Sequence, residues 1–141
     1  MIYKELENTD LFAMPADYAL AHCISSDTAL GAGIAVLFNK RFNMRAKLRK
    51  LPKEALKYPT CVYIDGVFNL ITKDKYWNKP TLETMRASLT KMKEQAIEMN
   101  IDKIAMPLIG CGLDRLHWAN VSYIIKEIFA DTDIEIVVCK I

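Results

Sequence analysis

The residues best suited to chemistry lie in one glycine-rich turn, Gly110-Cys111-Gly112, which is followed closely by Asp114. The apolar run Ile104-Ala105-Met106 stops at Pro107, and this proline indicates a strand end because it has no N–H to donate to a central ladder. A helical pattern starts near Trp118. A glycine turn between a strand and a helix offers free backbone N–H groups to an anion and lets a diphosphate approach the backbone closely. The alternative is a tight turn in which the glycines only supply positive φ.

A second glycine turn, Gly31-Ala32-Gly33, occurs earlier in the chain. It follows an apolar run at residues 18–24 and the polar segment Ser25-Ser26-Asp27, and it opens a helical pattern. An apolar run with little alternation is typical of a strand that is covered on both faces. Val36 stands where a dinucleotide-binding fingerprint has its third glycine, so this turn is weak evidence for a Rossmann site. The chain contains no GKS or GKT, which excludes a P-loop.

The totals indicate a globular chain and exclude several classes of protein. With 141 residues, of which 52% are hydrophobic and 26% charged, we expect one domain over residues 1–141 with a substantial core. The net charge of +2 gives no global argument for nucleic-acid or membrane binding. No apolar run approaches the roughly 20 residues of a membrane span, and residues 1–5 do not resemble a signal peptide. We therefore expect a cytoplasmic protein that does not bind membranes, and we expect it to be a monomer.

The cysteines do not form a metal-binding pattern. They are widely spaced, without a CxxC or paired histidine ligands, and three of the four fall in apolar runs that predict buried strands; they are Cys23, Cys61, Cys111 and Cys139. We expect no metal and no cofactor, and reduced thiols in a cytosolic protein. Cys111 as a nucleophile beside His22 or His117 is an alternative that no metal or catalytic spacing supports.

Apolar periodicity predicts the fold class. We expect a turn at residues 11–15, strands at residues 2–6, 18–24, 61–64, 67–71, 101–106 and 134–139, and helices that open near Gly31, Thr81 and Trp118. Asp65-Gly66 between two apolar runs is a strong hairpin signal. One helical face carries regularly spaced apolar residues, whose methionines we interpret as core filler: Leu82, Met85, Leu89, Met92, Ala96 and Met99. The order of these elements predicts a three-layer α/β/α fold with a mixed central sheet.

Residues 39–53 carry seven lysines and arginines and no acidic residue. Such a segment is most simply a solvated helix face. The alternative is a basic rim beside an anionic ligand.

Six segments, in order along nearly the whole chain, share one resemblance: Asp10-Leu11-Phe12, His22-Cys23-Ile24-Ser25, Gly31-Ala32-Gly33-Ile34-Ala35, Leu70-Ile71-Thr72-Lys73, Lys79-Pro80-Thr81 and residues 106–115. Together they resemble the macro domain family, most closely its terminal ADP-ribose protein glycohydrolase branch. The chain lacks the Asn-Ala-Asn segment and the longer triple-glycine loop of the commoner hydrolytic macro domains. Thr9 replaces a glycine that is common in the branch, and Leu108 stands where a basic residue can occur.

The resemblance implies a binding site for ADP-ribose. It assigns Asp10 to the adenine amino group, with Leu11 beside it, whereas Asp10 taken alone fits a turn cap. Ser25 and the turn through Gly33, Ile34 and Ala35 would line the distal ribose and a phosphate. The diphosphate would lie against the backbone of the second glycine loop, at Ile109, Gly110, Cys111, Gly112 and Leu113.

The resemblance also implies a catalytic pair, Lys73 and Asp114. The bond to be cut joins C1 of a ribose to a carboxylate oxygen of a modified side chain, and an unprotonated amine can attack that carbon to give a covalent lysyl intermediate. Asp114 would act as general base or acid for this attack and for the water that resolves the intermediate. Without the resemblance, Lys73 fits a solvated lysine in a KDK loop, and Asp114 fits a helix cap or a partner of Arg115.

The implied function is therefore removal of mono-ADP-ribose from modified acidic side chains, with deacetylation of O-acetyl-ADP-ribose as a second activity. The implied partners are ADP-ribose and ADP-ribosylated proteins. Two alternatives stay open: an enzyme that strips ADP-ribose from DNA bases, for which ADP-ribosylated nucleic acid would be a partner, and a module that reads ADP-ribose without cutting it. Tyr76 and Trp77 fit either a cover for a ligand or base, or a loop anchor.

Overall fold

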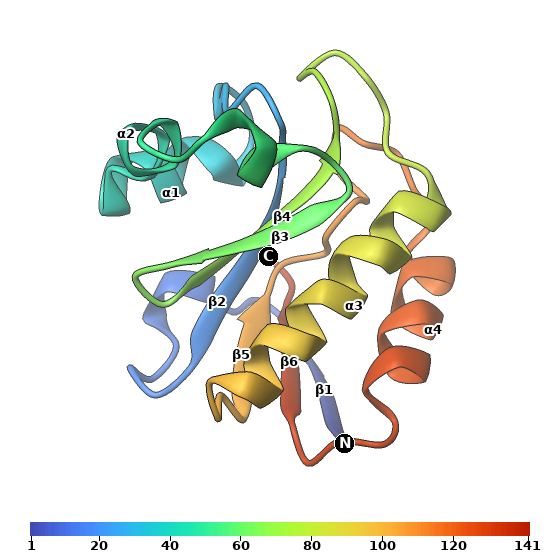
Figure 1. Ribbon diagram of the computed structural model, residues 1–141. Helices are drawn as coiled ribbons and strands as arrows, with labels where there is room; N and C mark the ends of the chain where they lie inside the picture. The colour runs from blue at the N-terminus through green and yellow to red at the C-terminus, as the bar shows by residue number, and fades with distance from the viewer.

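A six-stranded sheet with helices on both faces forms the centre of the computed structural model, which describes residues 1–141 (Figure 1). The strands are β1 (Ile2–Leu6), β2 (Ala19–Ser25), β3 (Thr60–Ile64), β4 (Val67–Lys73), β5 (Lys103–Met106) and β6 (Glu135–Cys139). The helices are α1 (Ile34–Phe42), α2 (Met44–Arg49), α3 (Leu82–Glu98) and α4 (Trp118–Phe129), with short 3₁₀ helices η1 (Leu11–Ala13) and η2 (Lys53–Leu56). The expected α/β/α fold with a mixed sheet is confirmed.

The strand order β1-β6-β5-β2-β4-β3 places a topological switch point between β2 and β5. All neighbouring strands pair in parallel except β3 and β4, which form the antiparallel hairpin predicted around Asp65-Gly66. From β2 the chain returns to the sheet on the β4 side, whereas from β5 it returns on the β6 side. A crevice at the carboxyl ends of the strands is the common ligand site at such a point. Both glycine turns follow strands that end there.

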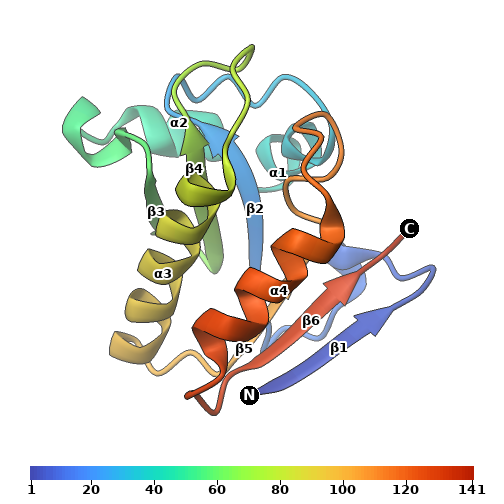
Figure 2. The same ribbon diagram turned by 90° about the vertical axis from the view of Figure 1, so that its right-hand side faces the viewer.

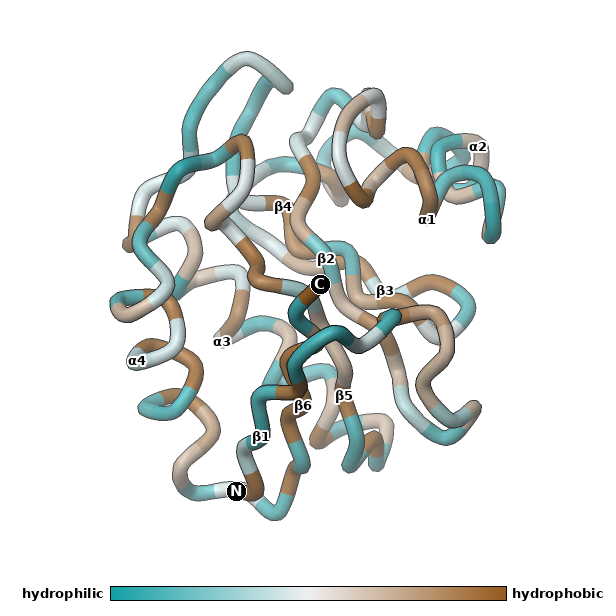
Figure 3. Tube along the Cα trace, turned by 180° about the vertical axis from the view of Figure 1, so that it is seen from behind, coloured by the Kyte–Doolittle hydropathy of each residue, from teal (hydrophilic) through white to brown (hydrophobic).

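The two faces of the sheet are buried by different helices, as Figures 1 and 2 show. Helices α3 and α4 cover one face, and their core includes Met85, Met92, Ile125 and Phe129, all fully buried. Helices α1 and α2 cover the other face, where Phe38 is among the buried residues. In Figure 3 the apolar segments follow the strands and α1, whereas α2 carries a long hydrophilic stretch. None of the four helices combines the length and the apolar character that crossing a membrane requires.

Three element boundaries differ from the sequence-based expectation. Residues 11–13 form η1 rather than a plain turn, because the Asp10 carboxylate accepts the Phe12 N–H and caps it. The strand expected from residue 101 begins at Lys103, because the Ile101 N–H is used to cap the end of α3 at Ala96 O. Helix α3 begins at the Thr81 cap as expected, but its end residues Leu82 and Met99 are exposed, so the core face is shorter than the periodic pattern.

Candidate functional site

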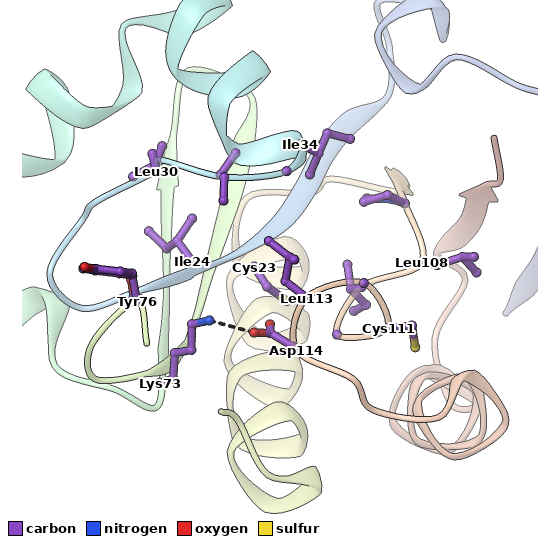
Figure 4. Close-up of a pocket in the computed structure, with 18 of the residues that line it drawn as sticks. Cys23, Ile24, Leu30, Ile34, Lys73, Tyr76, Leu108, Cys111, Leu113 and Asp114 are labelled. Atoms are coloured by element: carbon purple, nitrogen blue, oxygen red, sulfur yellow. Dashed lines mark hydrogen bonds and ion pairs between the residues drawn. The ribbon is translucent and has the colours of Figure 1, made fainter. Parts of the chain in front are cut away.

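A cavity of about 740 Å³ opens at the carboxyl ends of the parallel strands (Figure 4). Its walls are the ends of β2 and β4, the loop that leads into α1, and the loop that follows β5. The lining includes most of the residues singled out from the sequence: Ser25, Gly33, Ile34, Ala35, Lys73, Ile109, Gly110, Cys111, Gly112, Leu113 and Asp114. Residues from four separate segments thus meet because parallel strands end at one edge of the sheet.

The loop after β5 presents unused backbone donors. It closes on itself through several backbone hydrogen bonds, of which the bond from Leu116 N–H to Gly110 O is the shortest at 2.7 Å. Within residues 110–114 of this loop, four N–H groups donate to no acceptor in the protein, those of Gly110, Gly112, Leu113 and Asp114. Such a group of free donors can bind an anion without any positively charged side chain.

The start of α1 faces the same cavity. Gly33 precedes the helix with φ +61°, which a residue with a side chain rarely adopts. The N–H groups of Gly33, Ile34 and Ala35 donate to no protein acceptor, as expected for the first turn of a helix. The exposed side chain of Leu113 reaches across from the other loop, 4.0 Å from where a Cβ on Gly33 would lie. The two donor groups therefore face one ligand-sized space.

Lys73 and Asp114 form an ion pair at one end of the cavity (Figure 4), with 2.6 Å between Nζ and Oδ1. Each side chain is only 14% exposed. Lys73 is the last residue of β4, and Asp114 belongs to the loop after β5, so β2 lies between the two strands that position them. An amine beside a carboxylate can pass its proton to that carboxylate and then act as a nucleophile.

The two glycines of the loop after β5 differ in the space that is available for a side chain. Gly110 has φ +74°, and a Cβ there would lie 2.7 Å from Met85 Cε and 3.1 Å from Leu116 Cδ1. Gly112 has no atom within 4 Å of its Cβ position. We expect Gly110→Ala to lower the free energy of unfolding by about 2–4 kcal/mol, through the positive φ and the overlap. Gly112→Ala is the matched control and should melt with the unmodified protein. Equal melting temperatures of the two variants would contradict the loop geometry.

Asp10 and Leu11 do not line the cavity. Asp10 is exposed and accepts the Phe12 N–H at 3.0 Å, as the cap reading of this residue predicts. Burial raises the pKa of the Cys139 thiol, and the nearby Asp10 carboxylate raises this pKa further. Cys139 lines the cavity. Leu11 is buried in the core under α1, so its side chain is occupied by packing. Asp10 thus borders one end of the cavity, whereas the Leu11 side chain faces away from it.

The alternative of a cysteine nucleophile finds no histidine partner at the cavity. Burial, and then the nearby Asp114 carboxylate, raise the pKa of the Cys111 thiol, which disfavours the reactive thiolate. Neither histidine lines the cavity. His22 lies beneath α1, stacked on Phe38, and its Nε2 is 2.7 Å from Asn69 Oδ1. Burial lowers the pKa of His22 to about 4, so the ring is neutral and structural.

Sequence reasoning did not single out several lining residues as ligand contacts, among them Cys23, Ile24, Leu30 and Lys79. Lys79 donates from Nζ to the Leu113 carbonyl oxygen at 2.6 Å and so ties the loop after β4 to the loop that carries Asp114. Lys79 belongs to the segment Lys79-Pro80-Thr81, which is part of the family resemblance, and this membership was the sequence signal that could have identified it. Cys23 and Ile24 are consecutive residues near the end of β2, and both line the cavity because it opens at the strand ends, a placement that no local pattern marks.

Two known proteins are similar to almost the whole chain. The chain is similar to ADP-ribose glycohydrolase OARD1 of Bos taurus, with 47% identity over 131 residues that cover 92% of this chain and 86% of that protein. It is 46% identical over 131 residues to ADP-ribose glycohydrolase OARD1 of Homo sapiens, with the same coverage. No family model matches the chain.

Solved structures share the fold at lower identity. The macrodomain of Mycobacterium tuberculosis DarG has a TM-score of 0.87 at 23% identity and covers 98% of this chain and 97% of its own. The macrodomain of Thermus aquaticus DarG has a TM-score of 0.86 at 21% identity, with the same coverage. Thermosipho africanus DarTG in complex with ADP-ribose has a TM-score of 0.82 at 16% identity and covers 98% of this chain and 42% of its own.

Proposed function

Because this chain belongs to the macro domain family, in its terminal ADP-ribose glycohydrolase branch, we propose that it binds ADP-ribose and hydrolyses the ester that links ADP-ribose to acidic side chains of modified proteins. The observation that carries the proposal is the contact of 2.6 Å between Lys73 Nζ and Asp114 Oδ1. This pair lies in the wall of a cavity whose two loops offer free N–H groups. The loop after β5 would hold the diphosphate, and the start of α1 would hold the distal ribose. The adenine would lie toward the end of the cavity that Asp10 borders.

The pair supports a two-step reaction. In the first step Lys73 passes its proton to Asp114, and the amine lone pair forms a bond to C1 of the distal ribose. The bond between C1 and the ester oxygen breaks, the carboxylate of the modified side chain leaves with the electron pair, and Asp114 gives its proton to that carboxylate and so becomes a carboxylate again. In the second step Asp114 takes a proton from water, the water oxygen bonds to C1, and the Lys73 nitrogen leaves and regains a proton. The net reaction consumes one water and releases the free acid and ADP-ribose.

O-acetyl-ADP-ribose with its acetyl group on the C1 oxygen of the distal ribose contains the same bond from C1 to an ester oxygen, so we propose that the same site hydrolyses it. The acetyl group is small enough to need no contact beyond the catalytic pair. This second substrate therefore reports on the cavity alone, whereas a modified protein also touches the surface outside it.

The test of the proposed function offers the unmodified protein three substrates: a glutamate-linked ADP-ribosyl peptide, O-acetyl-ADP-ribose and ADP-ribosylated DNA. Released ADP-ribose is measured by chromatography. We expect release from both esters. Release from the DNA alone would establish the base-specific alternative, and no release from any substrate, together with ADP-ribose binding, would establish a reader.

Binding is expected to need no metal, because backbone N–H groups take the place of a cation. Calorimetry with ADP-ribose in the presence of a chelator should show one site. Gly112→Ala should weaken this binding about tenfold, or ~1.4 kcal/mol, because its methyl group stands where the diphosphate approaches the backbone. Absence of binding by the unmodified protein in chelator would refute the ligand assignment. Unchanged affinity of Gly112→Ala would move the diphosphate away from this loop.

A further inference from the structure

Two large aromatic side chains stand exposed beside the catalytic pair. Tyr76 and Trp77 lie in the loop between β4 and α3, with 63% and 64% of their surfaces exposed. Tyr76 lines the cavity on the side of Lys73 (Figure 4), whereas Trp77 lies outside the lining. The two rings touch each other edge to face, with centroids 5.0 Å apart. A contiguous exposed aromatic surface on a soluble protein commonly marks an interaction site.

The loop that carries this pair is tied down at several points. The Tyr76 N–H donates to Asp27 Oδ2 at 2.9 Å, which anchors the loop to the segment after β2. The Lys75 N–H donates to Asn78 Oδ1 at 2.9 Å, and the Asn78 N–H returns a bond of 2.9 Å to Lys75 O. Lys79 holds the far end of the loop through the Leu113 carbonyl. The aromatic pair is therefore held in place by the loop, and neither ring is buried by the rest of the protein.

The position of the pair indicates what covers it. Tyr76 lines the cavity on the side of Lys73 (Figure 4), so the acyl group of a substrate whose ribose C1 lies beside the ion pair would leave the cavity past this ring. We propose that Tyr76 and Trp77 form a docking surface for the polypeptide that carries the ester, so that residues flanking the modified acid pack on the two rings. This inference rests on the proposed function and adds to it the part of the substrate that lies outside the cavity.

A polypeptide fits this surface better than a nucleic acid does. The rings stand at 87° to each other, so they form a corner and not a pair of parallel faces between which a base would stack. A phosphodiester chain needs several free cations along its path. In this loop only Lys73 is paired with an acidic side chain, which leaves two cations, Lys75 and Lys79, the latter held by the Leu113 carbonyl oxygen. Aromatic anchors are the residues that most often dominate polypeptide interfaces.

Three side chains of the basic segment at residues 39–53 are held by contacts within the protein. Arg45 donates to the Ala29 carbonyl oxygen at 3.0 Å, Arg49 donates to Thr28 Oγ1 at 3.0 Å, and Lys47 pairs with Asp65 at 2.5 Å. The cations of the aromatic loop itself, Lys75 and Lys79, favour an acidic residue beside the modified one. The expected partner is thus an acidic polypeptide with an apolar residue next to the ester.

The experiment compares two substrates on two variants. Trp77→Ala removes the aromatic surface outside the cavity, and Tyr123→Ala is a matched control because Tyr123 is also 64% exposed but belongs to α4. For a glutamate-linked ADP-ribosyl peptide with acidic and apolar flanking residues, we expect Trp77→Ala to raise KM about tenfold with kcat unchanged. For O-acetyl-ADP-ribose, both constants should equal those of the unmodified protein. Tyr123→Ala should change neither substrate, and Trp77→Phe should restore most of the peptide affinity.

The other outcomes separate the two proposals. If the unmodified protein cleaves both esters and Trp77→Ala has the same KM for the peptide, the docking surface is refuted and the proposed function stands. If Trp77→Ala raises KM for ADP-ribosylated DNA but not for the peptide, the polypeptide assignment is overturned in favour of a nucleic acid. If the unmodified protein cleaves neither ester, the proposed function fails and the docking assignment fails with it.

Discussion

Replacing Lys73 by alanine is expected to lower the hydrolysis of a glutamate-linked ADP-ribosyl peptide by about 10³-fold or more, because the variant has no amine to attack the ribose carbon. Binding of free ADP-ribose should persist, since in the proposed binding mode the diphosphate contacts backbone N–H groups of loops to which Lys73 does not belong. Calorimetry and a steady-state assay on the same preparation measure both effects. The combination of intact binding with lost turnover is the expected result.

Two further variants show whether the loss of activity in Lys73→Ala comes from the missing amine or from unfolding. Lys73→Ala leaves the Asp114 carboxylate without its partner in a mostly buried place, which itself costs stability. Lys73→Arg keeps a cation beside Asp114 but offers no amine that attacks, so it should be folded and inactive. Lys75→Ala removes an exposed lysine two positions away and should turn over O-acetyl-ADP-ribose normally. Substantial activity in Lys73→Arg would rule out a lysine nucleophile.

Replacing Asp114 by alanine is expected to reduce turnover by about 10²–10⁴-fold, the usual contribution of a positioned general base. In the proposed mechanism Asp114 accepts the proton of Lys73 and later that of water, so its loss would slow both steps. In the Asp114→Ala variant, raising the pH removes the proton from Lys73 without the help of a carboxylate. The attack on the ribose carbon should then recover, whereas the hydrolysis of the intermediate should stay slow. Rapid-quench measurements between neutral and alkaline pH separate the two rates. A loss that is the same at every pH would contradict this division of roles.

Local sequence patterns predicted most of the fold. Asp65-Gly66 between two apolar runs is a complete hairpin signal, and the structure confirms an antiparallel pair there. The apolar spacing in the last helix matches the buried positions of α4, including Val121, Ile125 and Phe129. These signals are strong because the period of side chains in a helix or strand depends only on near neighbours in the chain.

The ion pair of Lys73 and Asp114 could not be predicted by local reasoning. Lys73 and Asp114 are separated by 41 positions, and only the sheet order places the end of β4 near the loop after β5. From the residues alone, each had a simple structural explanation, and the resemblance to a family paired them. The exposed ends of α3 illustrate the same limit, because helical spacing alone does not say where the core stops.

The surroundings of the cavity also depended on tertiary contacts. Lys79 contacts the Leu113 carbonyl across 34 positions, and Tyr76 is anchored to Asp27 across 49 positions. Neither contact follows from composition or period. Asp10 shows the reverse case, since its cap on Phe12 is a local contact that the residue alone favoured, whereas its assignment to the adenine came from the resemblance and stays a prediction.

The most direct test of a lysine nucleophile is the mass of the Asp114→Ala protein after incubation with O-acetyl-ADP-ribose at alkaline pH. Denaturing mass spectrometry, followed by peptide mapping, should find one added ADP-ribosyl group on the peptide that contains Lys73. The double variant with Lys73→Ala should carry none, because the attacking amine is gone. If Asp114→Ala gains no mass while the unmodified protein cleaves the same ester, Lys73 does not form a covalent intermediate and the proposed mechanism is wrong.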